Sequence, residues 1–194
     1  TQNNSNIQEN LIISVYQTRE RKYWIGTMSG LASGMKTDFQ KYDQSQGNLS
    51  HNSVNAFAET RDGSLWVATD DGLNRLYPEA EQFTWINEAT KPALSQPRVM
   101  SLFDDNDFLW IGTFDGGLNK LDLTSLEVKI FKHSRLKDNS LGANGVTSML
   151  RTSGGDLLVG TYGGGLSLYH SETDTFTNFT HNPENDKSIS NNEV

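Results

Sequence analysis

Residues 109–122 read LWIGTFDGGLNKLD and residues 65–77 read LWVATDDGLNRLY, so the chain carries nearly the same stretch twice. Related stretches are YWIGTMSGLASGM (23–35) and LLVGTYGGGLSLY (157–169). The anchor position of the four copies is taken by Trp24, Trp66, Trp110 and Leu158, at spacings of 42, 44 and 48 residues. A repeat of this period is typical of solenoids, propellers and other arrays, so it decides how the rest of the sequence is interpreted.

The repeat extends upstream of the anchor. LSHNSVNAFAET (49–60) aligns with LSQPRVMSLFDD (94–105) and LGANGVTSMLRT (141–152), and IQENLIISVYQT (7–18) is a weaker copy. ISNNEV (189–194) opens a further copy. We therefore divide the chain into repeats at 7–48, 49–93, 94–140 and 141–188, followed by the start of another unit.

Strand patterns fill the second repeat. Residues 54–60 alternate between apolar and polar types, which predicts a strand with Val54, Ala56 and Ala58 on one face. Turn-forming Arg-Asp-Gly follows at 61–63, and further turns are expected at 70–72 and 78–81. We expect the other three strands at 64–69, 73–77 and 83–87.

Four antiparallel strands in about 42–48 residues have the size of one β-propeller blade. The sequence therefore predicts an all-β chain of about four blades, with residues 1–194 forming a partial propeller. Stacking buries both faces of each blade, and we expect Trp24, Trp66 and Trp110 to fill the space between blades. Leu158 takes the anchor position of the fourth blade, where its smaller side chain predicts thinner packing. Trp85 lies on the fourth strand of its repeat and is expected to be more exposed than Trp66 and Trp110.

Glycines cluster after the second strand of the repeats. Glycine at such a turn allows a positive φ at little steric cost. A phosphate-binding loop is disfavoured, because no helix follows and no Lys-Ser/Thr pair is present. The glycines assigned this structural role are Gly72, Gly116, Gly117, Gly163, Gly164 and Gly165.

Composition excludes several classes of protein. The formal net charge of −8 and the pI of about 4.9 argue against binding to nucleic acid, which needs clustered Lys and Arg. The absence of cysteine excludes disulfides and thiolate metal sites. No apolar run approaches the roughly 18–20 residues of a membrane span, so no direct membrane insertion is expected. The polar start, TQNNSNIQEN, does not have the pattern of a signal peptide.

Residues for catalysis or metal binding do not form a recognisable motif. His51, His133, His170 and His181 share no metal-ligand spacing, and no Gly-x-Ser-x-Gly stretch occurs. DDNDF (104–108) resembles a calcium loop only in composition and is better explained as a polar hairpin turn. We therefore expect no catalytic residue, no metal and no cofactor.

One edge of the blades is the expected ligand-binding face. The turns after the second strands and the loops before the first strands should lie on the same side, where propellers often bind ligands. Aromatic and carboxylate groups there suit a small molecule or an oligosaccharide, through stacking and directed hydrogen bonds. Ordinary loop composition is the alternative for each of the candidates, which are His51, Asn52, Asp70, Asp71, Arg98, Phe114, Asp115, Asn144 and Tyr162.

The repeat closely resembles that of the two-component regulator propeller family. Residues 49–77, 94–122 and 141–169 carry most of the pattern LS-x-N-x-V followed by D-x-x-G-x-LW-[IV]-G-T-x-x-GGL-x-[KR]-L. WD40, kelch and sialidase repeats place their Asp, Trp or Gly residues differently. The chain departs from the pattern at Ala68, which replaces a glycine, at Leu158, and after Leu31, where no basic residue follows.

The resemblance implies a ligand-sensing, non-catalytic propeller of a bacterial receptor. Family members have seven-bladed propellers outside the cytoplasmic membrane, a membrane helix, and a histidine kinase or diguanylate cyclase output. The chain would then be a periplasmic fragment whose partners are further blades of the same protein. A propeller enzyme acting on glycans and a protein-docking scaffold are the alternatives. We expect an open arc whose end blades are covered by neighbouring copies, as a homo-oligomer; a closed four-bladed ring is the competing arrangement.

Overall fold

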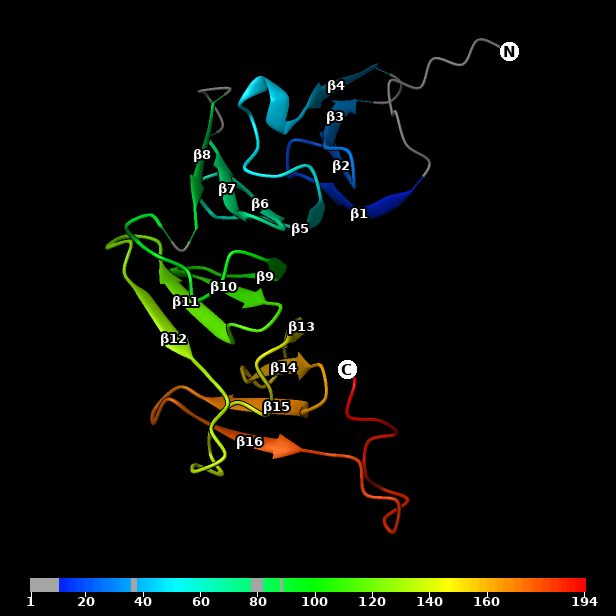
Figure 1. Ribbon diagram of the computed structural model, residues 1–194, viewed down its shortest axis with the longest axis vertical. Helices are drawn as coiled ribbons and strands as arrows, with labels where there is room; N and C mark the ends of the chain where they lie inside the picture. Colours follow the sequence, from blue (N-terminus) through cyan, green and yellow to red (C-terminus); the bar gives the residue numbers. More distant parts are fainter. Residues whose placement is uncertain (1–10, 36–37, 78–81, 88) are drawn as a thin grey trace. The chain divides into compact units, whose positions relative to one another are not determined.

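The computed structural model of the chain describes residues 11–35, 38–77, 82–87 and 89–194. It divides into two compact units, residues 1–99 and residues 100–194, and each unit holds two four-stranded antiparallel sheets (Figure 1). The predicted start of the first repeat at residue 7 and the predicted turn at 78–81 lie outside the described residues. Within the described residues, no helix is long and apolar enough to cross a membrane.

Unit 1 contains the first two sheets, and in both the spatial order of the strands is their order along the chain. The first sheet consists of β1 (Ile12–Gln17), β2 (Tyr23–Thr27), β3 (Leu31–Met35) and β4 (Asp38–Tyr42), followed by a 3₁₀ turn, η1 (Gln44–Gln46). The second sheet consists of β5 (Val54–Glu59), β6 (Leu65–Thr69), β7 (Gly72–Leu76) and β8 (Phe83–Ile86).

Unit 2 repeats this arrangement. Its first sheet consists of β9 (Val99–Asp105), β10 (Phe108–Thr113), β11 (Leu118–Asp122) and β12 (Val128–Phe131). Its second sheet consists of β13 (Val146–Arg151), β14 (Leu157–Thr161), β15 (Gly165–His170) and β16 (Thr175–Phe179). Each sheet is a propeller blade, which confirms the predicted fold class; the strands of the second repeat begin and end within one residue of their predicted bounds.

The predicted single face of the strand at 54–60 is wrong, because a β-bulge interrupts it. Val54 is paired with Thr69, but Ala56 is paired with Ala68, so one extra residue is inserted between them. Val54 therefore points to the face opposite that of Ala56 and Ala58. Equivalent bulges interrupt β1 between Ile12 and Ser14 and β13 between Val146 and Ser148.

Trp24 lies in the core that joins the two sheets of unit 1. It shares a buried cluster with Leu31 and Tyr42 of its own sheet and with Val54 and Val67 of the second sheet. Replacing such a buried Trp by Ala costs about 3–5 kcal/mol. The expected position of Trp24 between neighbouring blades is therefore observed.

Trp110 has the same place in unit 2. Its ring lies 5.9 Å from that of Phe131 and 4.9 Å, edge to face, from that of Tyr169 on the next sheet. Trp66 is also buried, whereas Trp85 is 43% exposed. Leu158, at the fourth anchor position, is only half-buried.

A threonine closes the second strand of each sheet and fixes the turn to the third strand. The Oγ1 atom of Thr69 donates a hydrogen bond to the carbonyl oxygen of Gly72 at 2.9 Å, and Thr113 bonds Gly117 in the same way at 2.8 Å. Gly117 has a φ of 87°, and a Cβ there would lie 2.2 Å from the carbonyl oxygen of Phe131. The sequence motif Gly/Ala-Thr thus closes the turn between the second and the third strand of each sheet.

The prediction of a positive φ is wrong for two of the six glycines, Gly116 and Gly164. Gly72, Gly117, Gly163 and Gly165 adopt the expected positive φ. Gly164 does not, and is required instead by close approach, since its Cβ would lie 2.3 Å from the carbonyl carbon of Gly142. Gly116 donates its N–H to Thr113 Oγ1 at 3.0 Å.

Short segments that precede the first strands connect one sheet to the next. We call residues 49–54, 94–99, 141–146 and 189–194 the docking segments. Each ends in a valine whose carbonyl oxygen accepts a hydrogen bond from the bulge region of the preceding sheet. The donors are Ser14 to Val54 at 3.3 Å, Asn55 to Val99 at 2.8 Å, Ser101 to Val146 at 3.2 Å, and Thr147 to Val194.

Backbone hydrogen bonds complete this docking. The N–H of Gly72 donates to Pro97, that of Gly117 to Asn144, and that of Gly165 to Asn192. The last docking segment also forms an isolated bridge between Tyr162 and Glu193. The six residues at 189–194 therefore contact the sheet β13–β16 as residues 141–146 contact the sheet before it.

Candidate functional site

The nine residues predicted to form a ligand-binding face divide between the two units. All of them lie in docking segments or directly after second strands, at the predicted end of their blades. His51, Asn52, Asp70, Asp71 and Arg98 belong to unit 1, and Phe114, Asp115, Asn144 and Tyr162 belong to unit 2.

In unit 1 two of the candidates bind each other. The Oδ1 atom of Asp70 accepts hydrogen bonds from Arg98 Nε at 3.1 Å and from Asn55 Nδ2 at 2.9 Å. The ion pair is partly exposed, so its contribution to stability is small, about 0–1 kcal/mol. These three side chains use their polar groups on one another, which leaves less capacity for a ligand.

The histidine and the asparagines of the docking segments hydrogen-bond the backbone. His51 Nδ1 accepts the N–H of Ser53 at 3.0 Å, and Asn52 Oδ1 accepts the N–H of Gln44 at 2.8 Å. In unit 2, Asn144 Oδ1 accepts the N–H of His133 at 2.8 Å. The recurring Asn of the sequence pattern therefore holds the loop between two blades in place.

The four candidates of unit 2 line one cavity of about 620 Å³. Phe114 and Tyr162 are its largest side chains and are 51% and 64% exposed. Its remaining lining residues are mainly small or apolar: Met100, His133, Gly142, Ala143, Gly145, Val146, Thr147 and Gly163. We call this cavity the aromatic cavity.

The lining of the aromatic cavity can bind a ring with one apolar face. Two aromatic side chains offer flat surfaces for stacking, and Asp115 is a hydrogen-bond acceptor at the edge. His133 Nδ1 lies 2.9 Å from the carbonyl oxygen of Leu141, which can only accept, so Nδ1 carries the proton of the neutral ring. The Nε2 atom of that tautomer is then a second acceptor.

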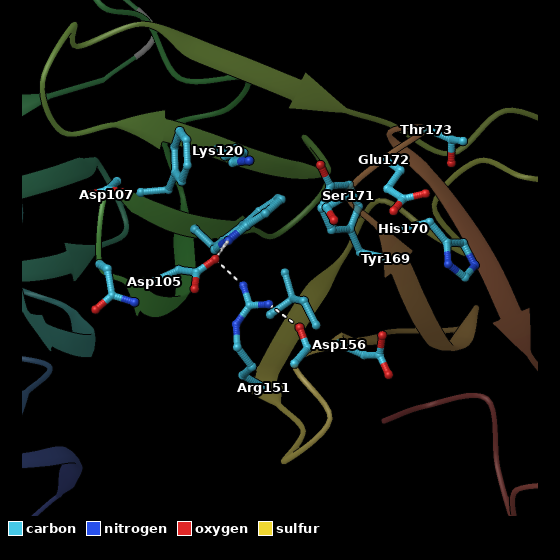
Figure 2. A pocket seen from close by; sticks show the side chains of 15 residues that line it. Asp105, Asp107, Lys120, Arg151, Asp156, Tyr169, His170, Ser171, Glu172 and Thr173 are labelled. Carbon is cyan, nitrogen blue, oxygen red and sulfur yellow. Dashed lines mark hydrogen bonds and ion pairs between the residues drawn. The ribbon is translucent and has the colours of Figure 1, made fainter.

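A larger cavity, of about 840 Å³, lies in unit 2 at the end of its two sheets that is opposite to the aromatic cavity (Figure 2). Asp105 accepts a hydrogen bond from Trp110 Nε1 at 3.1 Å and forms an ion pair with Arg151 of the next sheet. Asp105 and Arg151 point toward one another in Figure 2. The charged residues at the centre of this cavity therefore join β9 to β13.

Further charged groups around this cavity also link the two sheets. Tyr169 donates a hydrogen bond to Asp174 at 2.5 Å, and Asp174 forms an ion pair with Lys129 of the preceding sheet. Burial and the Asp174 carboxylate both raise the pKa of the Tyr169 hydroxyl above its ordinary value. The ammonium of Lys120 lies 3.8 Å from the ring centre of Phe108 and 5.1 Å from that of Trp110.

The residues around the larger cavity were not predicted from the sequence, although the sequence contained one indication of them. The repeat pattern has a Lys or Arg in the third strand, and both basic residues lie over the Trp paired with them: Lys120 over Trp110, and Arg75 over Trp66 at 4.9 Å. The stretch DDNDF contains the predicted hairpin turn between β9 and β10, which consists of Asn106 and Asp107. Among the described residues, no three His, Cys, Asp or Glu are placed to hold a metal ion.

Comparison with protein families finds one match. The family described as Two component regulator propeller matches residues 48–71, which include the first docking segment, β5 and β6. Residues 48–71 therefore match the repeat of the two-component regulator propeller family, as the sequence pattern indicated. No curated protein matches the chain.

Solved structures share the fold. The extracellular domain of the putative hybrid two component system BT4673 from B. thetaiotaomicron is 24% identical, with a TM-score of 0.77 over 98% of this chain and 25% of that chain. That of the putative hybrid two component system BT3049 from B. thetaiotaomicron is 22% identical, with a TM-score of 0.76 over 89% of this chain and 25% of that chain. The chain spans about a quarter of the length of these proteins.

An enzyme has a related fold at lower identity. Streptogramin B lyase is 11% identical, with a TM-score of 0.69 over 95% of this chain and 59% of that chain. At such identity the likeness shows that the architecture is shared and does not extend to the chemistry of a site.

Proposed function

We propose that the chain is part of the ligand-sensing propeller of a bacterial transmembrane signalling receptor, lies in the periplasm, and has no catalytic activity of its own. The observation that carries this proposal is the match of residues 48–71 to the two-component regulator propeller family. The fold shared with extracellular domains of hybrid two-component systems supports it. The output, a histidine kinase or a diguanylate cyclase, would belong to the rest of the protein.

The aromatic cavity is the proposed ligand site. Its stacking surfaces at Phe114 and Tyr162 and its acceptor at Asp115 suit a small molecule or an oligosaccharide. A ligand bound there would contact both sheets of unit 2, because Phe114 follows β10 and Tyr162 follows β14. Binding would thereby strengthen or shift the contact between two blades, which is a change that a receptor can transmit.

Further blades of the same protein are the proposed partners of the sheet β13–β16. Leu150, Leu158 and Leu168 lie side by side across three of its strands, and Leu150 is 61% exposed. In the preceding sheet, the position of Leu158 is taken by Trp110, which the next blade covers. Isolated copies of the chain would use this face for self-association.

A binding screen with a product assay tests the function. Neutral and anionic oligosaccharides are added to the chain, the melting temperature is measured, and each sugar is analysed for breakdown. We expect at least one sugar to raise the melting temperature and to be recovered intact. Sugar breakdown that is lost on replacing a single carboxylate would identify an enzyme instead.

A Phe114→Ala variant places the ligand in the aromatic cavity. The variant should lose the sugar-dependent rise in melting temperature, because it removes one stacking surface. Phe179→Ala is the matched control, since Phe179 is exposed on β16 and does not line the aromatic cavity. An unchanged response in Phe114→Ala would show that the sugar binds elsewhere.

A further inference from the structure

Two of the anchor tryptophans donate their indole N–H to the residue at the end of the first strand of their sheet. Trp66 Nε1 donates to Thr60 Oγ1 at 3.2 Å, and Trp110 Nε1 donates to Asp105 Oδ2 at 3.1 Å. Because the docking segment precedes the first strand, both acceptors lie at the end of the blade opposite to it. The same repeat position thus supplies a hydroxyl acceptor in one sheet and a carboxylate acceptor in the next.

Trp24, the anchor of the first sheet, lacks this hydrogen bond. Trp24 is only 3% exposed, and its Nε1 atom has no hydrogen-bond partner among the described residues. Thr18 is at the acceptor position, but its Oγ1 atom accepts the N–H of Lys22 at 3.2 Å instead. The indole of Trp24 therefore carries a buried donor without an acceptor, which is rare in folded proteins.

The hairpin turn before each anchor explains the difference between the first two sheets. TRE (18–20) aligns with TRD (60–62), so Glu20 takes the position of Asp62. Asp62 Oδ1 accepts the N–H of Ser64 at 3.1 Å and the hydroxyl of Thr60 at 2.6 Å, which leaves the Thr60 oxygen free to accept the indole N–H. In the first sheet the N–H of Lys22, which corresponds to Ser64, uses the threonine oxygen itself.

A cavity of about 410 Å³ in unit 1 is lined by both Trp24 and Thr18, and we call it the unit 1 cavity. It corresponds to the larger cavity of unit 2, which Trp110 and Asp105 line. In unit 2 the Asp105 carboxylate approaches the indole from this end of the blade. A carboxylate inside the unit 1 cavity can therefore take the place relative to Trp24 that Asp105 takes relative to Trp110.

Basic side chains line the unit 1 cavity without an ion pair. Among the described residues, no carboxylate lies within ion-pair distance of Arg19, Lys22 or Arg61, and all three contribute to the lining. Lys22 Nζ lies 4.8 Å from the ring centre of Trp24. A positive charge therefore lies beside the ring that carries the unpaired N–H, and the two groups together suit one anionic acceptor.

Acidic side chains in the same lining do not outweigh this charge. Asp62 is paired with Arg75 at 2.6 Å, and Glu59 accepts the backbone N–H of Arg19 at 2.9 Å. Once Asp62 is neutralised by its pair, the three basic residues face two carboxylates, those of Glu20 and Glu59. The remaining excess of one positive charge favours a ligand with one negative charge.

We propose that the unit 1 cavity binds a small carboxylate, one oxygen of which accepts the indole N–H of Trp24. The ligand takes the role that Asp105 has in unit 2, and Lys22 balances its charge. The volume of the cavity admits a molecule as large as a monosaccharide acid. This site lies in unit 1 and does not depend on any ligand of the aromatic cavity.

The test follows the indole N–H signals of the four tryptophans by ¹H–¹⁵N NMR while a probe is added at constant ionic strength. The probes are acetate and glucuronate, with acetamide and glucose as their neutral counterparts. The Trp24 signal, assigned with a Trp24→Phe variant, should shift with acetate or glucuronate until it saturates. The neutral counterparts should leave it in place.

Thr18→Asp gives the first sheet the carboxylate that Asp105 supplies in the third. The variant should bind acetate at least about tenfold more weakly than the parent chain, because its own carboxylate occupies the site. Thr152→Asp is the matched control, since Thr152 has the same repeat position in the fourth sheet, where Leu158 has no N–H to donate. This control should bind acetate as the parent chain does.

Glu20→Asp guards against misfolding of Thr18→Asp. It restores the residue type of Asp62 to the first hairpin without a change in charge, so Thr18 becomes free to accept the indole N–H. The variant should therefore also weaken the binding of acetate.

The outcomes decide the proposal in either direction. If both carboxylates leave the Trp24 signal unchanged, a water molecule is its acceptor and the proposal is wrong. The proposal is also wrong if the neutral counterparts shift the signal equally, or if the folded Thr18→Asp and Glu20→Asp variants bind acetate as tightly as the parent chain. An equal loss of binding in Thr152→Asp would show an effect of net charge and would overturn the site.

Discussion

Ala56 and Ala68 lie directly opposite one another in β5 and β6, at a position where the other sheets combine a serine with a glycine. Ser14 is paired with Gly26, and Ser148 with Gly160. A Cβ on Gly26 would lie 2.4 Å from Ser14 Oγ, so the serine excludes any larger residue opposite it. The departure of Ala68 from the repeat pattern is therefore matched by a second change on the neighbouring strand.

The first prediction concerns this pair. Ala56→Ser should destabilise the chain by about 1–3 kcal/mol, because the new hydroxyl would overlap the Cβ of Ala68. The double variant Ala56→Ser/Ala68→Gly restores the combination found in the other sheets and should recover most of the loss. Urea denaturation of the single and double variants measures both effects. Equal losses in the two would mean that the residues are not coupled.

The second prediction concerns the exposure of the tryptophans. A soluble quencher such as acrylamide should reduce the fluorescence of Trp85, which is 43% exposed, much more than that of Trp66 or Trp110, which are buried. Variants in which one Trp at a time is replaced by Phe assign the signals. Strong quenching of Trp66 with protection of Trp85 would contradict the assignment of strands to blades.

The third prediction concerns pH. Burial favours the protonated form of Asp62, but hydrogen bonds from Thr60 and Ser64 and the charge of Arg75 outweigh it and lower the pKa of Asp62 to about 2. A carboxyl group with a lowered pKa in the folded state stabilises the fold above its unfolded pKa, and this stabilisation is lost as the pH falls toward the folded pKa. Asp62→Asn should therefore destabilise the chain at pH 6, and the difference should shrink between about pH 4 and about pH 2.

Urea denaturation across this pH range measures the effect. Asp138→Asn, in the exposed loop between β12 and β13, is the control for a general change in charge. A difference between the parent chain and Asp62→Asn that is the same at pH 6 and at pH 2 would show that the carboxylate is not stabilised by its neighbours.

The fourth prediction concerns the uncovered face of β13–β16. Isolated copies of the chain should associate at high concentration, because Leu150, Leu158 and Leu168 form an apolar row on this sheet. Leu150→Glu should shift the chain toward monomer in light scattering. Leu136→Glu, in a loop where the side chain is 95% exposed, is the matched control. A parent chain that stays monomeric at every concentration would contradict the prediction.

The sheets were predictable from the sequence because each strand and turn has a local signal. Alternation, turn-forming Asp-Gly and the repeated Trp located the four strands of the second repeat within one residue. The bulge after Val54 was not predictable in this way, since it depends on pairing with β6 and on the carbonyl of Val99, which Asn55 binds. That bulge is the reason why Val54 and Ala58 point to opposite faces.

The candidate site was predictable only as an edge of the blades. The repeat placed nine residues near that edge, but it contained no information on which side chains bind each other. Asp70 and Arg98 meet in an ion pair, whereas Phe114 and Tyr162 border a cavity. Such differences between equivalent junctions depend on contacts between repeats and become visible only in the folded chain.

The docking segments bear on how such a chain can lengthen during evolution. Each segment carries the valine carbonyl that its preceding sheet binds, and each first strand carries the donor for the segment that comes next. A gene duplication that copies the stretch from one docking segment to the next therefore brings a complete acceptor and a complete donor with it. The junctions on either side remain compatible, so whole blades can be inserted or deleted by recombination.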